Sequence, residues 1–228
     1  MRAAERDKLL LTLAITSGSA DGWSYMGLGH AFVANMTGNT VLLGIATFGE
    51  RLNLLPPLIS LVCYAAGVAI GSLVTRKVKQ SSIWSKSISL VLFFEFLLLV
   101  AAEATWIRSG GRPNPMTKAL LLGDVATAIG LQSGAMLPLK LPGIITTYIT
   151  GTWTTLVSGL VLMGSGQERV HGNQAAFEDR LIIQIVFLVI YFLSAVATGW
   201  IFRYKPELVG VIASAPILVV VAYGALRN

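Results

Sequence analysis

The sequence predicts an all-α, polytopic membrane protein: a helix bundle of about six to eight spanning segments, built from two pseudo-symmetric repeats with broken helices. Composition is the first reason. Of the 228 residues, 54% are hydrophobic and 12% are charged, whereas soluble domains carry about 25% charged residues. The mean hydropathy is +0.72. Eight apolar stretches approach or reach the roughly 20 residues that a helix needs to cross hydrocarbon.

These eight stretches divide into two groups of four. Each is expected to be a helix, because a helix satisfies its own backbone polar groups in lipid. The polar run Gly-Gly-Arg-Pro-Asn-Pro at 110–115 separates them and is typical of a solvated connector. We therefore expect one integral membrane domain over 1–228, with a first repeat at 9–107 and a second at 117–226. The stretches cover residues 9–27, 31–48, 54–74, 88–106, 119–137, 144–163, 181–202 and 208–226.

The two halves carry a similar motif at matching places. In the first half a small polar step around Asp21 is followed by Thr37-Gly38-Asn39, and in the second a step around Gln132 is followed by Thr150-Gly151-Thr152. Duplicated, interrupted apolar segments are typical of membrane transporters. We expect the halves to superpose. We also expect helix breaks within 17–22 or 36–40, and within 130–134 or 150–152.

Asp21 is the most informative single residue, because it lies near the middle of the first apolar stretch. A carboxylate at that depth costs at least ~2.5–3.5 kcal/mol, so it faces a cavity or a partner. One interpretation is a proton or cation site, or a gate that unwinds the helix. The other is a carboxylate that caps a helix fragment or pairs with a basic side chain.

The Thr-Gly steps form the second candidate site. A Gly-Asn pair favours a helix break, and the freed amides and carbonyls at such a break bind ions. Thr37, Gly38 and Asn39 in the first half, with Thr150, Gly151 and Thr152 in the second, are therefore candidate solute ligands. The alternative is close helix packing through small residues, without any ligand. Gln132 is the neutral candidate counterpart of Asp21, in an alignment uncertain by one or two residues.

The topology stays open between two arrangements. If all eight segments cross, the halves are parallel repeats and both termini share a side. If one broken segment in each half is re-entrant, the halves are inverted three-helix repeats, and the basic residues at the N-terminus lie on the same side as Arg76, Lys77 and Lys79. The positive-inside rule does not decide between these arrangements from the sequence alone.

Enzyme and cofactor motifs are missing from the sequence. It has no nucleophile elbow, phosphate loop or His-Glu-x-x-His helix, so we expect a protein that is not an enzyme and binds no cofactor. With one cysteine and two histidines it offers no ordinary metal site. The net charge is +6. The basic residues lie at the ends of the apolar segments, where they bind lipid headgroups, so the charge does not indicate nucleic-acid binding. The expected partners are the lipid bilayer, a small polar or ionic solute and, in a homo-oligomer, further copies of the chain.

Two motifs resemble a known family. Met36-Thr37-Gly38-Asn39-Thr40 and the later Gly130-Leu131-Gln132, followed by Thr146-Thr147-Tyr148-Ile149-Thr150-Gly151-Thr152, resemble the YoaK-like family, known as domain of unknown function 1275. The resemblance implies a multi-pass protein of the bacterial inner membrane and implies no substrate. This chain has Ser133-Gly134 where that family usually has Asn-Ala.

Two functions remain in competition at this point. The first is a small-solute transporter or channel with a polar site between the repeats, at the broken helices. The second is a non-transporting scaffold or accessory subunit, in which the same small residues only pack helices; a lipid-modifying enzyme is a weaker third. Replacement of Asp21 with asparagine separates the first two, because transport predicts lost uptake with unchanged folding, whereas packing predicts lost expression alone.

Overall fold

A computed structural model describes residues 3–49, 53–78, 84–139, 149–164 and 174–227. Within these ranges the chain forms α-helices at the places of the eight apolar stretches, which confirms the all-α polytopic class. Short 3-10 helices follow α5, at Leu137–Leu139, and precede α8, at Pro206–Leu208. The α-helices are α1 (Ala3–Gly27), α2 (Met36–Ala46), α3 (Leu55–Thr75), α4 (Lys86–Arg108), α5 (Pro115–Met136), α6 (Ile149–Gly164), α7 (Gln174–Tyr204) and α8 (Val211–Arg227).

The helices fall into spanning and short ones. Among the described residues, α3, α4, α5, α7 and α8 are long and apolar enough to cross a membrane. Helix α1 has 25 residues and carries several buried polar side chains, so its composition is less apolar although its length suffices. Helix α2 has 11 residues, which at 1.5 Å per residue is about 16 Å, roughly half of a hydrocarbon core. Helix α2 is therefore too short to cross.

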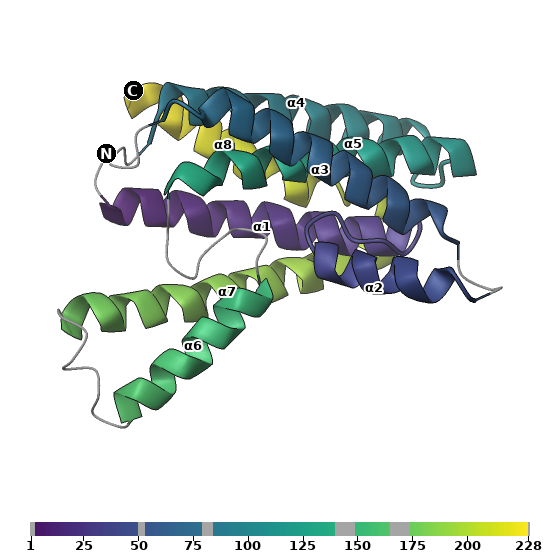
Figure 1. Cartoon of the computed structure of the whole chain (residues 1–228). Coiled ribbons are helices and arrows are strands. Elements are labelled where there is room, and N and C mark those ends of the chain that lie inside the picture. Colours follow the sequence, from purple (N-terminus) through teal and green to yellow (C-terminus); the bar gives the residue numbers. More distant parts are fainter. Residues whose placement is uncertain (1–2, 50–52, 79–83, 140–148, 165–173, 228) are drawn as a thin grey trace.

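The first helix of each half packs along the third helix of the other half. Helix α1 runs through the centre of the molecule and packs on α7, while α5 packs on α3. Helix α4 contacts α5 and α8, and α8 contacts α1. The two short helices lie at the periphery, α2 on α3 and α6 on α7 (Figure 1). The four-helix groups seen in the sequence are thus interleaved rather than side by side.

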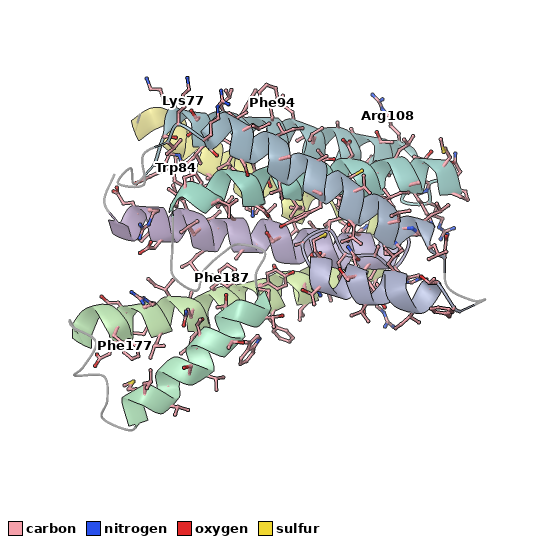
Figure 2. All side chains as sticks on the ribbon, in the orientation of Figure 1. Lys77, Trp84, Phe94, Arg108, Phe177 and Phe187 are labelled. Carbon is pink, nitrogen blue, oxygen red and sulfur yellow. The ribbon has the colours of Figure 1, made fainter. Side chains whose placement is uncertain are left out.

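Corresponding helices of the two halves run in opposite directions. In Figure 1, α1, α2, α4 and α7 run from left to right, whereas α5, α6, α8 and α3 run from right to left. The ends marked N and C lie on the same side of the molecule. Lys77, just after α3, and Arg108, at the end of α4, lie at opposite ends of the bundle (Figure 2).

Glycines allow the closest helix contacts. Gly67 and Gly71 on α3 face Gly130 and Gly134 on α5, and a Cβ at Gly71 would lie 2.5 Å from the carbonyl oxygen of Leu131. On α1, a Cβ at Gly18 would lie 2.6 Å from the Tyr191 carbonyl oxygen of α7. Small residues spaced by four let membrane helices approach at backbone distance. The glycines at 18, 22, 130 and 134 are therefore packing residues.

Apolar side chains occupy both the interior and the outer surface. Trp23 on α1 meets Trp106 on α4 edge-on, with ring centroids 5.7 Å apart, and the Trp106 indole donates a 2.7 Å hydrogen bond to the carbonyl of Pro206. Phe187 is fully buried, in a cluster of α1, α6 and α7 side chains. Phe94 points outward from α4 (Figure 2). Such exposed apolar residues are ordinary for a surface that faces lipid.

In each half, one of the two alternative places for a helix break is excluded. Helix α1 is continuous through residues 17–22, and α5 is continuous through 130–134. The glycines there pack against neighbouring helices, so the helical hydrogen bonds stay intact. In the first half a helix boundary lies at the Thr-Gly step instead, because α2 begins at Met36. In the second half, α6 is described from Ile149 onward. Residues 140–148, which precede that helix, lie outside the described residues.

Candidate functional site

A cavity of about 720 Å³ lies among α1, α2, α3, α5, α6 and α7. Its polar walls come from Asp21 and Tyr25 of α1, Tyr64 of α3, Tyr191 of α7, Ser133 of α5, Asn35 at the start of α2, and Thr37 and Thr150 of the two short helices. Tyr64 and Tyr191 lie near the middle of their helices. The cavity is therefore at membrane depth. Its volume is within the range of small-molecule sites, about 300–1,000 Å³.

Asp21 joins three parts of this cavity. Its Oδ1 accepts hydrogen bonds from the backbone N–H groups of Val33 at 2.8 Å, Ala34 at 2.7 Å and Asn35 at 3.4 Å. Its Oδ2 accepts one from the hydroxyl of Tyr191. The chain that follows α1 thus returns to the body of that helix before α2 begins. The carboxylate holds this returning segment in place just before α2.

Asn39 fixes the same segment from the other side. Its side chain accepts a 2.8 Å hydrogen bond from the Phe32 N–H, donates a 2.6 Å bond to the Phe32 carbonyl and donates a 3.0 Å bond to Ser60 on α3. Asn35 caps α2 by accepting a hydrogen bond from the Gly38 N–H at 3.0 Å. Asn39 and Gly38 are predicted solute ligands, but neither is among the described cavity-lining residues. Their polar groups position the loop.

Gln132 lies beside the cavity wall rather than on it. It is fully buried, and its Nε2 donates a 3.0 Å hydrogen bond to Ser17 Oγ, which ties α5 to α1. The neighbouring Ser133 lines the cavity instead. The packing of α5 on α3 explains why Ser133 and not Gln132 lines the cavity. On α5, Gly130 and Gly134 face the carbonyls of Tyr64 and Val68 of α3. On α1, Gly18 and Gly22 face the carbonyls of Tyr191 and Ala195 of α7 in the same way. In that register Ser133 takes the place on α5 that Asp21 takes on α1.

Of the remaining predicted ligands, some line the cavity and others only pack within the helices. Thr37 and Thr150, each in the first turn of a short helix, both line the cavity. Gly151 accepts a hydrogen bond from Thr155 Oγ1 at 2.9 Å within α6, and Thr152 is fully buried. Neither is among the described lining residues. Of the eight candidates, the cavity therefore brings together Asp21, Thr37 and Thr150.

Other acidic residues lie away from the cavity. Glu103 on α4 accepts a 2.8 Å hydrogen bond from the Ser214 hydroxyl of α8. Glu95 is fully buried in α4, and neither of its carboxyl oxygens has a hydrogen-bond partner among the described residues. In the described part of the chain, no group of three or more His, Cys, Asp or Glu residues comes together to hold a metal ion.

Comparison with known proteins identifies a family and a relative. The family model described as "Protein of unknown function (DUF1275)" matches residues 9–223. This chain belongs to that family. It is 30% identical over 224 residues to the UPF0700 transmembrane protein YoaK of Bacillus subtilis (strain 168), covering 96% of this chain and 92% of that relative. No solved structure matches. The family match confirms the expected resemblance and, with the apolar helices, a multi-pass membrane protein.

Sequence reasoning missed most of the aromatic lining of this DUF1275 protein. Tyr25, Phe32, Tyr64 and Tyr191 all line the cavity, and the Tyr25 and Phe32 rings stack at 4.9 Å with 18° between their planes. A signal for two of them was present, because Tyr64 and Tyr191 stand at matching places in the third segments of the two halves. Tyrosine is common at membrane interfaces, so that match alone did not distinguish a site residue from an anchor.

Proposed function

We propose that this chain is a small-solute transporter or channel of the bacterial inner membrane, with its solute site in the cavity between two inverted repeats. The observation that carries the proposal is that the cavity walls come in matched pairs from the two halves. Met36 with Ile149, Thr37 with Thr150, Tyr64 with Tyr191, and Asp21 with Ser133 all line it. A solute site at a repeat interface near the bilayer midplane is the usual arrangement in secondary transporters.

Three features support inverted repeats. Helix–helix contacts have counterparts when the two halves are exchanged. The contact of α1 with α7 corresponds to that of α5 with α3, and the contact of α2 with α3 corresponds to that of α6 with α7. Corresponding helices run in opposite directions (Figure 1). The short helix α2 and the helix α6, which is inclined away from the bundle (Figure 1), then take the re-entrant place in each half. Six helices cross in this arrangement, so both termini share one side.

A packing role alone does not account for the cavity. The glycines at 18, 130 and 134 have a complete explanation in helix contacts, which is the observation that favours a scaffold. However, well-packed interiors leave few voids larger than a water molecule. A cavity of about 720 Å³ with a carboxylate, hydroxyls and an amide on its walls is the form expected of a ligand site.

The proposal is tested by a solute screen on purified protein in liposomes. We expect uptake of at least one small polar or ionic solute by the wild type and loss of that uptake in Asp21→Asn, which keeps an oxygen for the loop amides but removes the charge. Thr105→Ala, on an exposed part of α4, serves as the matched control and should transport normally. If Asp21→Asn folds and transports every solute as the wild type does, the cavity carboxylate has no part in transport and the proposed site is wrong.

Charge distribution predicts the orientation. Among the described residues, more Lys and Arg lie at the end of the bundle that holds the two termini than at the other end. The first end has seven, at positions 6, 8, 76, 77, 86, 180 and 227. The other end has five, at positions 108, 112, 118, 203 and 205. The positive-inside rule then places both termini in the cytoplasm. A fluorescent protein fused to Asn228 should fluoresce, and alkaline phosphatase fused after Gly110 should be active. The opposite pair of results contradicts the inverted six-helix topology in this orientation.

A further inference from the structure

We propose that the cavity selects small organic cations: an amine or ammonium head on an apolar, preferably aromatic, body. This inference rests on the proposed function and narrows its substrate class. Three properties of the described lining favour such a ligand: its charge, its rings and the free acceptor capacity of Asp21.

Charge is the first property. Among the described residues that line the cavity, Asp21 is the one carboxylate, and no lysine, arginine or histidine is present. The rings of His30 and Tyr25 meet edge-on, at 5.3 Å between centroids, but His30 is not among the described lining residues. An anion in the cavity would face the Asp21 carboxylate with no basic side chain of the described wall to offset it. A cation in the cavity would instead be attracted to the Asp21 carboxylate, and the low polarity of the surroundings strengthens that attraction.

The aromatic rings are the second property. Tyr25, Phe32, Tyr64 and Tyr191 line the same cavity, and the rings of Tyr25 and Phe32 stack on each other with their centroids 4.9 Å apart. Aromatic faces attract ammonium groups, including the primary ammonium of lysine, through the ring quadrupole, and clusters of such rings bind quaternary ammonium groups in other proteins. The same rings also accommodate an aromatic body by stacking.

The hydrogen-bond capacity of Asp21 is the third property. Its Oδ1 already accepts three backbone N–H groups, whereas Oδ2 accepts one hydroxyl, that of Tyr191. A carboxylate oxygen has two lone-pair sites, so Oδ2 keeps one for an ammonium N–H of a ligand. The rest of the wall is largely apolar, with Met26, Met36, Val68 and Ile149. Such walls suit an organic body and do not suit a hydrated inorganic ion.

Three ligands of nearly the same shape test the class. They are 2-phenylethylamine, which is a cation at neutral pH, 2-phenylethanol, which is neutral, and 3-phenylpropionate, which is an anion. Binding to the purified full-length protein in nanodiscs is measured by calorimetry. We expect the amine to bind at least tenfold more tightly than the alcohol, and the anion to bind most weakly of the three.

Two variants separate ring recognition from general packing. Phe32→Leu should weaken amine binding by roughly 3- to 30-fold, the range of a cation–ring contact, and should change alcohol binding much less. Phe192→Leu replaces an exposed ring on the outer face of α7 and should leave all three affinities unchanged. Equal loss of amine and alcohol binding in Phe32→Leu would mean that the ring only fills space, which overturns the cation–ring part of the proposal.

The remaining outcomes distinguish this inference from the proposed function. Tighter binding of the anion or equal binding of the alcohol overturns the cation class while a solute site stands. If none of the three binds but the liposome screen finds another transported solute, the class is wrong and transport stands. If nothing binds and nothing is transported, both proposals fail.

Discussion

Replacing Gly130 with leucine is expected to remove most of the folded protein from the membrane. A Cβ at this position would collide with the backbone of α3 at Tyr64, Gly67 and Val68. Overpacking in a core typically costs about 1–3 kcal/mol, and here the obstacle is backbone, which cannot change rotamer. The helices α3 and α5 would have to separate, and that separation opens the cavity between them. The yield of monodisperse protein in detergent and its thermal unfolding temperature measure the effect.

A matched glycine provides the control. A Cβ at Gly199, on α7, would meet no heavy atom within 4 Å outside the backbone of its own helix, so Gly199→Leu should give nearly wild-type yield and unfolding temperature. Both variants add the same side chain to a membrane helix, and they differ in what surrounds it. If Gly130→Leu is as stable as Gly199→Leu, the close contact between α3 and α5 is wrong.

The second large effect is expected at Asp21, where alanine and asparagine should behave differently. Alanine removes the acceptor for the N–H groups of Val33, Ala34 and Asn35. A buried donor left without a partner costs about 1–3 kcal/mol, so Asp21→Ala should destabilise the protein by several kcal/mol. Asparagine keeps an Oδ1 acceptor and should lose far less, while still removing the charge needed for the proposed solute site.

The rate of amide hydrogen exchange at residues 33–35 measures the difference between Asp21→Ala and Asp21→Asn directly. Exchange there should accelerate strongly in Asp21→Ala and slightly in Asp21→Asn, whereas exchange in the middle of α4 should stay unchanged in Asp21→Asn. Equal acceleration in both variants would show that the charge, rather than the acceptor, holds the loop. No acceleration in Asp21→Ala would mean that Asp21 does not anchor the loop at all.

Much of the fold could be predicted from the sequence because a membrane-spanning helix requires a long run of apolar residues. The eight apolar stretches correspond to the eight helices named above, and the low charge content excludes a soluble domain. The sequence could not distinguish a helix break from a helix contact at Gly18 or Gly130, because both uses need a residue without a Cβ. The structure separates them through the partner: here a backbone carbonyl of the facing helix lies where a side chain would be.

The candidate site was predicted in part. Asp21, Thr37 and Thr150 line the cavity, and they were recognisable because polar groups are costly in lipid. Asn39 was equally polar, yet its amide is satisfied by Phe32 and Ser60. That satisfaction depends on how the chain returns after α1, which no local pattern describes. Gln132 and Ser133 are adjacent, and only the packing register of α5 on α3 decides which of them faces the cavity.

The central claim, an aqueous solute cavity between the halves, is tested most directly by thiol labelling of cavity positions. In a Cys63→Ser background, which removes the single native cysteine, cysteine is placed at Thr37, at Thr150 and, as the lipid-facing control, at Phe192. Because the thiolate is the reactive form and apolar surroundings suppress it, a water-soluble maleimide reports water access. We predict labelling at 37 and 150, little at 192, and slower labelling when a transported solute is present. Labelling at 37 and 150 as slow as at 192 would contradict the account.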